Sequence, residues 1–376
     1  MRVVICPDKF AGTLSAVEAA EAIAEGWRGV TPGDKLLIRP VADGGPGFLE
    51  VLHAALGGTL VEVPTTDPLD RPVTGQVLVA GDTTYVESAQ ACGLAHLVPD
   101  ERNPMRTTSF GLGALIRAAQ PGKVVVGLGG SGTNDGGAGW LAALGFTPVD
   151  AAGRPLAPGG AALADCAGLQ ISGQLKGIEL IGASDVDNPL NGPHGASAVF
   201  GPQKGASDKD VLILDAALAN WAEVLVRDLP GCPSGLAGLP GAGAAGGLGA
   251  AILALGGRII SGIDLVRDQT GLDAAISGAD LVITGEGSFD HQSLRGKVIA
   301  GVARAAQEQG VPCVVLAGRV TTGRRETGAA GVSEAYALVD HFGSVERAMA
   351  EPARGLRELA SRLARQYATS SGIGAV

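Results

Sequence analysis

The residues best suited to catalysis lie in acidic, glycine-rich segments that each follow a hydrophobic run. In one of them Asp185 and Asp187 stand two positions apart, so on an extended chain both carboxylates point to the same side. Two carboxylates beside the amide of Asn188 suit Mg²⁺, or a general base next to the metal. The same residues are also typical of a turn in which short polar side chains cap the backbone. The pattern favours a catalytic and metal-binding role for Asp185 and Asp187.

A glycine-dense turn is the second candidate. Three valines at 124–126 indicate a buried strand, glycines crowd residues 127–132, and a small-residue helix is predicted over 136–144. This order presents backbone N–H groups and a helix N-terminus to an anion, although the glycines alternatively only permit close packing. Asp135 either caps that helix or reaches a metal ion beside a phosphate. The candidate binding residues of the turn are Gly129, Gly130, Ser131, Asn134 and Asp135.

Three more acidic segments follow predicted strands. Asp43 begins a glycine turn for which a functional role and a plain turn are equally open, and Asp8 and Lys9 follow the first strand. Lys297 stands at a predicted helix start, where it either neutralises phosphate charge or is a solvated surface lysine. The binding candidates of that third segment, residues 284–297, are Glu286, Asp290 and Lys297.

Short motifs decide little in this chain. Gly127, Gly129 and Gly132 fit the dinucleotide fingerprint G-x-G-x-x-G, and Asp150 lies where a ribose-binding acid is expected. With 60 glycines among 376 residues such matches arise by chance, and a second one occurs at 241–246. The phosphate-binding pattern G-x-x-x-x-G-K-[ST] and the nucleophile pattern G-x-S-x-G are absent. An NAD-dependent oxidoreductase stays open as an alternative, whereas covalent hydrolysis does not fit.

Composition bounds the class of protein. A chain of 376 residues exceeds the size of one core, so two domains are expected, and 46% hydrophobic residues exclude global disorder. A net charge of −10 argues against nucleic acid or an anionic membrane as a partner. Five isolated cysteines predict buried thiols in a reducing cytoplasm. Residues 229–257 form a long uncharged run, but its prolines argue against a membrane span.

The two chain ends supply one pattern of secondary structure. A strand at 3–6, a helix at 15–27 and a strand at 36–39 form a β–α–β unit with parallel strands. Ser15 followed by Glu18 predicts a capping box for the helix. The alternation of strands and helices returns after residue 278. In open α/β sheets ligands bind at the carboxyl ends of the strands, which is where the polar loops begin.

The middle of the chain differs. Short, largely antiparallel strands are predicted at 59–63, 73–79 and 83–87, a further strand at 178–183, helices at 48–56, 108–119, 208–226 and 244–255, and loops at 148–168. We therefore expect an α/β fold of two domains. A Rossmann-like parallel-sheet domain would comprise residues 1–60 plus 276–376, and an inserted glycine-rich α/β domain with a mixed sheet would comprise 61–275. The cleft between them would be the default active site.

Acidic glycine loops without a nucleophile motif fit phosphoryl transfer, in which an enzyme mainly positions substrates and neutralises charge. Seven segments of the chain, in order, are PDKFAGTLSA, VADGGPG, GLGGSGTNDGGAG, ASDVDNPLNGPHGA, FGPQKGA, GAGAAGGLGAA and TGEGSFDHQSLRGKV. These segments occur in the same order in the bacterial glycerate kinases of the first class. The chain resembles that family from Arg2 to about Tyr367.

The resemblance implies ATP-dependent phosphorylation of D-glycerate to 2-phosphoglycerate by a two-domain α/β enzyme without a Walker loop. Two segments depart from the family pattern. The usual P-D-S-F-K-G has its lysine at Lys9 and an alanine, Ala11, where the lysine normally stands, and the usual D-G-G-E-G has Pro46 in place of its glutamate. The acids Asp8 and Asp43 keep their positions.

The resemblance also implies roles. Asp185 or Asp187 would activate the hydroxyl group while the other helps to hold Mg²⁺, and Asp43 is the third catalytic candidate. The substrate carboxylate needs a cation, for which Lys9, Arg71 and Arg295 are candidates. The expected ligands are ATP, Mg²⁺ and D-glycerate, bound by a cytoplasmic monomer or homodimer. A glycerate 3-kinase, another small hydroxy-acid kinase, and a non-enzymatic sensor of phosphorylated metabolites are the remaining alternatives.

Overall fold

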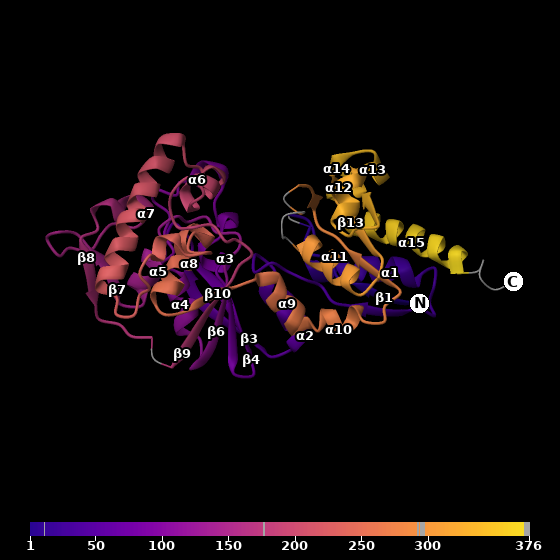
Figure 1. The fold of residues 1–376 in the computed structure, drawn as a ribbon, viewed down its shortest axis with the longest axis horizontal. Coiled ribbons are helices and arrows are strands. Elements are labelled where there is room, and N and C mark those ends of the chain that lie inside the picture. The colour runs from indigo at the N-terminus through magenta and orange to yellow at the C-terminus, as the bar shows by residue number, and fades with distance from the viewer. Residues whose placement is uncertain (11, 176, 292, 294–297, 372–376) are drawn as a thin grey trace. The chain divides into compact units, whose positions relative to one another are not determined.

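The computed structural model describes residues 1–376 except 11, 176, 292, 294–297 and 372–376 (Figure 1). Packing divides the chain into two compact units. Unit 1 comprises Met1–Ala42, Glu50–Leu56 and Ile263–Val376, and unit 2 comprises Asp43–Leu49 and Gly57–Gly262. Unit 1 contains a parallel sheet and unit 2 a mixed sheet, so the expected α/β class with both kinds of sheet is confirmed.

Unit 1 is built on five parallel strands in the order β15-β13-β11-β1-β2. The β1–α1–β2 unit is the one that the sequence predicts. Helix α2 (Phe48–Leu56) runs across the boundary between the units. The other elements are β1 (Arg2–Ile5), α1 (Ala16–Arg28), β2 (Lys35–Ile38), α9 (Gly262–Thr270), α10 (Leu272–Ile276), β11 (Leu281–Thr284), β12 (Ser288–Phe289), α11 (Val298–Glu308), β13 (Cys313–Ala317), β14 (Arg319–Val320), α12 (Arg324–Ala329), β15 (Glu334–Ala337), α13 (Leu338–Phe342), α14 (Val345–Ala350) and α15 (Pro352–Ser371).

Helix α1 shows how local sequence sets an element of unit 1. The Ser15 hydroxyl accepts the Glu18 N–H at 3.2 Å, and the Ser15 N–H donates to the Glu18 carboxylate at 2.8 Å, which confirms the capping box. The buried face carries Ile23 and Trp27. Gly26 lets α15 pack against this helix, because a Cβ there would lie 2.1 Å from the Arg357 carbonyl oxygen.

Unit 2 is built on six strands in the order β10-β9-β6-β5-β4-β3. The strands β3, β4 and β5 pair antiparallel, as predicted, while β5, β6, β9 and β10 are parallel. The valines at 124–126 are buried in β6, between β5 and β9. The strands are β3 (Thr59–Thr66), β4 (Pro72–Ala80), β5 (Thr83–Glu87), β6 (Gly122–Gly127), β7 (Phe146–Val149), β8 (Gly168–Ile171), β9 (Ile178–Ala183) and β10 (Arg258–Ile260).

Short helices and 3₁₀ turns connect the strands of unit 2, and α7 is its longest helix (Figure 1). The α-helices are α3 (Ala89–Cys92), α4 (Leu112–Arg117), α5 (Ala138–Ala143), α6 (Ala196–Phe200), α7 (Asp208–Asp228) and α8 (Ala244–Ala254). The 3₁₀ turns are η1 (Leu94–His96), η2 (Pro99–Glu101), η3 (Gly160–Asp165), η4 (Pro202–Lys204) and η5 (Leu236–Gly238).

Two predicted helices of unit 2 are too long. The helix predicted at 108–119 is α4, Leu112–Arg117, and the helix predicted at 136–144 is α5, Ala138–Ala143. Gly136 and Gly137 have φ of 61° and 74°, which an α-helix does not allow. A Cβ at Gly136 would lie 2.5 Å from Trp221 Cδ1, so this glycine lets the chain pass close to α7.

Two further local predictions need correction. The sequence analysis predicts neither β7 nor β8, which pair antiparallel, and the loop-rich prediction for residues 148–168 overlaps the end of β7 and the start of β8. The helix predicted at 244–255 is interrupted at its start, because residues 245–247 in α8 all have positive φ. There Gly246 packs on the Thr133 carbonyl oxygen, which a Cβ would approach to 2.0 Å. Contacts between distant segments override the helical pattern at this place.

All five cysteines are free thiols, and the predicted burial is confirmed for four of them, whereas Cys232 is half-buried. Among the described residues, no helix combines the length and the apolar character that crossing a membrane requires.

Candidate active site

Four neighbouring parallel strands of unit 2 end at one edge of the sheet. The register pairs Glu87 of β5 with Gly127 of β6, Gly127 with Ala183 of β9, and Ala183 with Ile260 of β10. The loops that follow these strands therefore begin side by side. The loops after β6 and β9 carry candidate residues from the sequence analysis, and Glu87 ends β5 at the same edge. This edge is where open α/β sheets bind their ligands.

The segment 43–47 packs on the same edge. The Gly129 N–H donates to the Gly44 carbonyl oxygen at 3.1 Å, and the Gly47 N–H donates to Glu87 Oε2 at 3.0 Å. Gly44 has φ of 87°, and a Cβ there would lie 2.6 Å from the Ala183 carbonyl oxygen. Only glycine allows this approach, which brings Asp43 to the loops after β6 and β9. Asp43 Oδ1 accepts the Gly45 N–H at 3.0 Å, a contact typical of the plain turn that the sequence left open for Asp43.

The loop after β9 holds the two acids with the strongest pattern. Asp185 is half-buried, and its Oδ1 accepts the Ser261 hydroxyl at 2.8 Å from the loop after β10. Asp187 is exposed, and Asn188 donates its amide to the His194 carbonyl oxygen at 2.8 Å. In the described part of the chain, no three histidine, cysteine or acidic side chains lie close enough to hold a metal by themselves. Metal binding by Asp185 and Asp187 stays a prediction.

The loop after β6 is the glycine turn. Gly130 is exposed and has φ of 76°, and its carbonyl oxygen accepts the Leu94 N–H at 2.9 Å. Gly132 donates its N–H to the Cys92 carbonyl oxygen at 2.7 Å. The Gly130 and Ser131 N–H groups donate no backbone hydrogen bond to any of the described residues. Two such groups in a tight turn can bind an anion.

Asp135 already occupies the helix N-terminus that the sequence offers to an anion. Its carboxylate is 1% exposed, and it accepts the Ser109 N–H and hydroxyl, both at 2.8 Å. It also accepts the N–H groups of Gly137 at 3.1 Å and Gly139 at 3.2 Å, and so caps α5. Burial raises the pKa of Asp135, while these hydrogen bonds act in the opposite direction. Asp135 therefore has the capping role that the sequence left open for it, and anion binding at this helix N-terminus stays a prediction.

Asn134 lies behind the turn and is fully buried. Its amide donates to the Ser197 hydroxyl of α6 at 2.9 Å. Its neighbour Gly136 donates its N–H to the Gly246 carbonyl oxygen at 2.9 Å. These contacts hold the second half of the turn against α6 and α8, and a direct role of Asn134 in binding stays a prediction.

A second group of candidates lies in unit 1. Strands β1 and β11 are in register at Ile5 and Ile283, and Asp8 donates its N–H to the Gly285 carbonyl oxygen at 2.8 Å. Asp8 and Glu286 therefore follow neighbouring strand ends. The Lys9 ammonium lies 3.7 Å from Asp8 Oδ1. Asp290 Oδ1 accepts the Ser293 N–H at 3.3 Å, whereas Lys297 and Arg295 lie outside the described residues.

The candidates thus fall into two groups. Those of unit 2 are Asp43, Gly129, Gly130, Ser131, Asn134, Asp135, Asp185, Asp187 and Asn188, and those of unit 1 are Asp8, Lys9, Glu286 and Asp290. The predicted cleft between two domains stays a prediction.

Comparison with known proteins decides the family. The model of the glycerate kinase family matches residues 3–368. The chain belongs to the glycerate kinase family. It is 41% identical over 380 residues to the glycerate kinase of Bacillus subtilis strain 168, covering 98% of this chain and 97% of that one. It is 39% identical over 383 residues to the glycerate 2-kinase of Escherichia coli K12, covering 100% and 99%.

A solved structure agrees with this assignment to the glycerate kinase family. The crystal structure of a candidate glycerate kinase 2 from Salmonella typhimurium LT2 matches with a TM-score of 0.81 and 38% identity, covering 99% of each chain. The resemblance that the sequence motifs carry is confirmed, and this member of the family is a phosphotransferase enzyme.

In this glycerate kinase family member, the described structure of residues 127–154 does not fit the dinucleotide fingerprint. The glycines at 127–132 do not open a helix, because α5 begins only at Ala138 behind the Asp135 cap. Asp150, the expected ribose ligand, pairs with Arg154 Nη2 at 2.7 Å.

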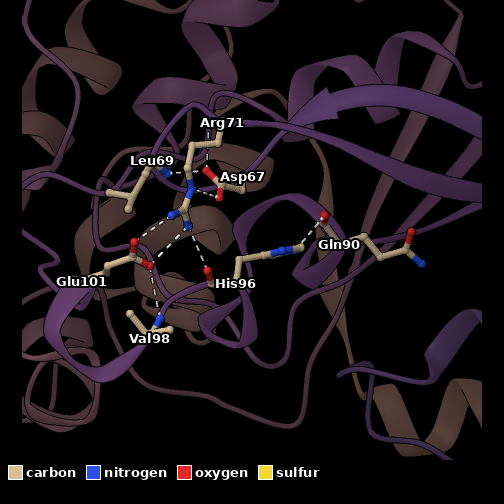
Figure 2. Close-up of polar contacts among 7 residues, drawn as sticks. All are labelled: Asp67, Leu69, Arg71, Gln90, His96, Val98 and Glu101. Carbon is tan, nitrogen blue, oxygen red and sulfur yellow. Dashed lines mark hydrogen bonds and ion pairs between the residues drawn. The ribbon is translucent and has the colours of Figure 1, made fainter.

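Arg71, a candidate for binding the substrate carboxylate, forms hydrogen bonds and ion pairs with other residues of the protein (Figure 2). Its guanidinium donates to Asp67 Oδ2 at 2.6 Å, to Glu101 Oε1 at 2.7 Å and to the His96 carbonyl oxygen at 3.0 Å. These contacts tie the turn after β3 to the segment 94–101, which also supports the glycine turn through Leu94. The geometry favours a structural role for Arg71.

Two residues of the unit 2 edge were missed by the sequence reasoning. Glu87 ends β5, and its Oε2 accepts the N–H groups of Gly47 at 3.0 Å and Leu49 at 3.4 Å. A charged residue at the end of the buried run TTYVE was the available signal. Lys204 is buried behind the glycine turn, and its only signal was its place in the family segment FGPQKGA.

Proposed function

We propose that this protein transfers the terminal phosphoryl group of ATP to the 2-hydroxyl of D-glycerate, giving 2-phosphoglycerate. One observation carries the proposal: Asp43, Asp185 and the Gly130 and Ser131 N–H groups of the glycine turn lie at the same edge of the unit 2 sheet. Phosphoryl transfer needs positioned acids and anion-binding N–H groups rather than a protein nucleophile. The relative named glycerate 2-kinase supports the choice of the 2-hydroxyl.

The acids after β9 would handle the proton of the substrate hydroxyl. A carboxylate within hydrogen-bond reach of that hydroxyl accepts its proton as the oxygen attacks phosphorus. Asp185 is oriented for this by the Ser261 hydroxyl, which engages one of its oxygens. Asp187 is exposed on the same loop and is the alternative base.

The same loop fits a magnesium ion. Mg²⁺ prefers carboxylate, phosphate and water oxygens, and it commonly uses only one or two protein carboxylates. Asp185 and Asp187 would supply two such groups. Bound there, the ion would neutralise charge on the nucleotide phosphates. The glycine turn would receive an anionic oxygen of a substrate on the Gly130 and Ser131 N–H groups.

The test is a product analysis. The protein is incubated with ATP, MgCl₂ and D-glycerate, and the product is identified by ³¹P NMR against authentic 2- and 3-phosphoglycerate. We expect 2-phosphoglycerate and ADP in equal amounts. Formation of 3-phosphoglycerate would replace the assignment by a glycerate 3-kinase. Phosphorylation of a different hydroxy acid, with none of D-glycerate, would overturn the substrate.

A further inference from the structure

Lys204 is a buried lysine that no step of the proposed reaction yet uses. Its side chain is 2% exposed, and its ammonium donates to the Ser131 hydroxyl at 3.0 Å and to the Thr133 carbonyl oxygen at 2.7 Å. Both acceptors belong to the glycine turn, 73 and 71 residues away in the sequence. Removing an ammonium group from water is costly, so such a residue persists where its charge or its hydrogen bonds are needed.

The backbone that carries Lys204 is held firmly. Lys204 ends η4, which lies between α6 and α7. The following residue, Gly205, has φ of 95°, and a Cβ there would lie 2.2 Å from the Arg102 carbonyl oxygen. Ala206 donates its N–H to the Gly201 carbonyl oxygen at 3.0 Å. The lysine therefore reaches the turn from a fixed base rather than from a flexible loop.

The charged and titratable groups that face the ammonium are Asp135 and Cys92. Burial lowers the pKa of Lys204 to about 8, and the Asp135 carboxylate opposes this shift. Burial also raises the pKa of Cys92 above the range in which its thiol ionises, so the thiol stays neutral. Lys204 is consequently cationic at neutral pH and loses its charge in mildly alkaline solution. A neutral amine keeps its N–H donors, so deprotonation removes the charge without removing both hydrogen bonds.

We propose that Lys204 is a positioning residue for phosphoryl transfer. It anchors the segment 131–133 and sets a positive charge behind the Gly130 and Ser131 N–H groups, where a substrate oxyanion binds. This inference rests on the proposed function and identifies the chemistry of that site. The oxyanion belongs either to a nucleotide phosphate or to the glycerate carboxylate, and the two substrates are separated in the experiment.

The experiment compares the wild type with Lys204→Met, which keeps the length of the side chain but has neither charge nor donors. Lys209→Met is the matched control, because Lys209 is an exposed lysine in the first turn of α7. KM for ATP, KM for D-glycerate and kcat are measured from pH 6 to pH 10. In Lys204→Met we expect one of the two KM values to rise by at least about tenfold at pH 7, the size of one lost charge-assisted contact. Lys209→Met should stay within about twofold of the wild type.

The pH profile separates this role from a merely structural one. In the wild type, kcat/KM for the same substrate should fall above about pH 8, following the pKa of Lys204. In Lys204→Met that alkaline fall should be absent. Wild-type KM values for both substrates in Lys204→Met, or an unchanged alkaline fall, would overturn the proposal.

A second variant covers the case in which Lys204→Met does not fold. Ser131→Ala removes one of the two acceptors and leaves the lysine bound to the Thr133 carbonyl oxygen. It should raise the same KM about three- to tenfold, the size of one lost hydrogen bond, while keeping the alkaline fall. Unchanged KM values in Ser131→Ala would contradict the anchoring role.

Binding measurements distinguish failure of this inference from failure of the proposed function. A non-hydrolysable ATP analogue with all three phosphates and, in a separate experiment, D-glycerate are titrated into the wild type and Lys204→Met by calorimetry, without turnover. Weaker binding of one ligand to Lys204→Met supports the inference even if the wild type does not phosphorylate D-glycerate. Equal binding of both ligands, in a protein that phosphorylates D-glycerate, overturns the inference alone.

Discussion

Single acidic side chains around the unit 2 edge differ in what they already bind. Asp135 is buried and accepts hydrogen bonds from Ser109, Gly137 and Gly139, so its oxygens are committed to holding the turn. Asp185 is half-buried and Asp187 is exposed, so a substrate can reach both. A catalytic carboxylate needs that access, because it must touch the reacting hydroxyl.

The first prediction concerns Asp185→Asn and Asp187→Asn. Asparagine keeps the shape of the side chain but loses the charge and the basicity. If the residue is the base, kcat should fall by about 10²–10⁴-fold with little change in Tm. If it is only a metal ligand, raised Mg²⁺ should recover part of the activity. Kinetics of each variant over a Mg²⁺ titration, with a melting curve, sort these cases.

Asp208→Asn is the matched control for these two variants, because Asp208 is an exposed acid at the start of α7. A lowered Tm with near-normal kcat in both Asp185→Asn and Asp187→Asn would contradict the assignment. The catalytic role would then move to Asp43 or Glu286, the next acids at strand ends.

The second prediction concerns Arg71→Met. Burial tends to raise the pKa of Asp67, but hydrogen bonds from the Arg71 backbone and guanidinium outweigh it, so the pKa is lowered. The stability that this ion pair adds is therefore present above the unfolded pKa of about 3.9 and is lost as pH falls through the folded value. Arg71→Met should lower Tm by about 2–4 °C at pH 7. The difference from the wild type should shrink below about pH 4.

KM for D-glycerate is the decisive kinetic readout for Arg71→Met. A structural residue leaves it within about twofold of the wild type. A tenfold rise in KM with an unchanged Tm would instead make Arg71 the cation for the substrate carboxylate.

At the scale of elements, glycines let separate loops meet at the end of the sheet. Gly44 and Gly129 bring the segment 43–47 onto the ends of β6 and β9 without room for a side chain. The strands supply the register, and the glycines supply the approach. Loss of either would separate Asp43 from the loops beside it.

The third prediction concerns Gly129→Ala. A Cβ there would lie 2.5 Å from the Gly45 Cα and 2.8 Å from its nitrogen, so backbone must move. We expect a loss of stability of about 1–3 kcal/mol, typical of overpacking, and a loss of kcat/KM of at least about tenfold. Chemical denaturation and steady-state kinetics measure both.

Gly238→Ala is the control in unit 2, since nothing lies within 4 Å of a Cβ at that position. It should change stability by no more than about 0.5 kcal/mol. Equal stability and equal kcat/KM of Gly129→Ala and Gly238→Ala would show that the close approach of the segment 43–47 to the loop after β6 is not needed for folding or activity.

At the scale of the whole molecule, strands from both chain ends form the unit 1 sheet. Strand β1 lies between β2 and β11, and β13 and β15 extend the sheet beyond β11. A chain that stops after residue 278 would keep only β1 and β2 of this sheet. Two parallel strands without the rest of the sheet do not make a stable unit.

The fourth prediction follows for that truncated chain. The backbone amides of residues 3–5 should lose their protection from hydrogen exchange, because β11 is no longer present to pair with β1. The fragment 61–275 should keep a cooperative unfolding transition, since it carries the mixed sheet of unit 2 except for the first two residues of β3. Full protection of residues 3–5 in the truncated chain would show that β1 is stable without the strands from the C-terminal part of the chain, and would refute the prediction.

The fifth prediction concerns net charge. The chain has a formal net charge of −10, and a nucleoside triphosphate is itself strongly anionic, so the protein and the nucleotide repel each other unless a cation intervenes. ADP release should therefore require both D-glycerate and a divalent metal. Turnover at the wild-type rate in excess EDTA would refute the metal requirement, and ADP release without D-glycerate would refute the coupling to substrate.

The sequence by itself determined the features that near neighbours in the chain control. The capping box of α1, the antiparallel strands β3 to β5 and the buried valines of β6 all follow from local spacing. The acids after β9 were also visible, because a polar loop after a buried run marks a strand end. Hydrophobic periodicity and capping are short-range effects, so they are written in a few consecutive residues.

Only the tertiary structure decided which polar groups the protein keeps for itself. Lys204 reaches Ser131, Asp135 reaches Ser109, and Glu87 reaches Gly47, each across at least 26 residues of sequence. No local pattern encodes such partners, because they depend on which strands become neighbours and on where glycines admit a second backbone. That is why the sequence left two roles open for Asp135 and overlooked Lys204, although both residues stood in family segments.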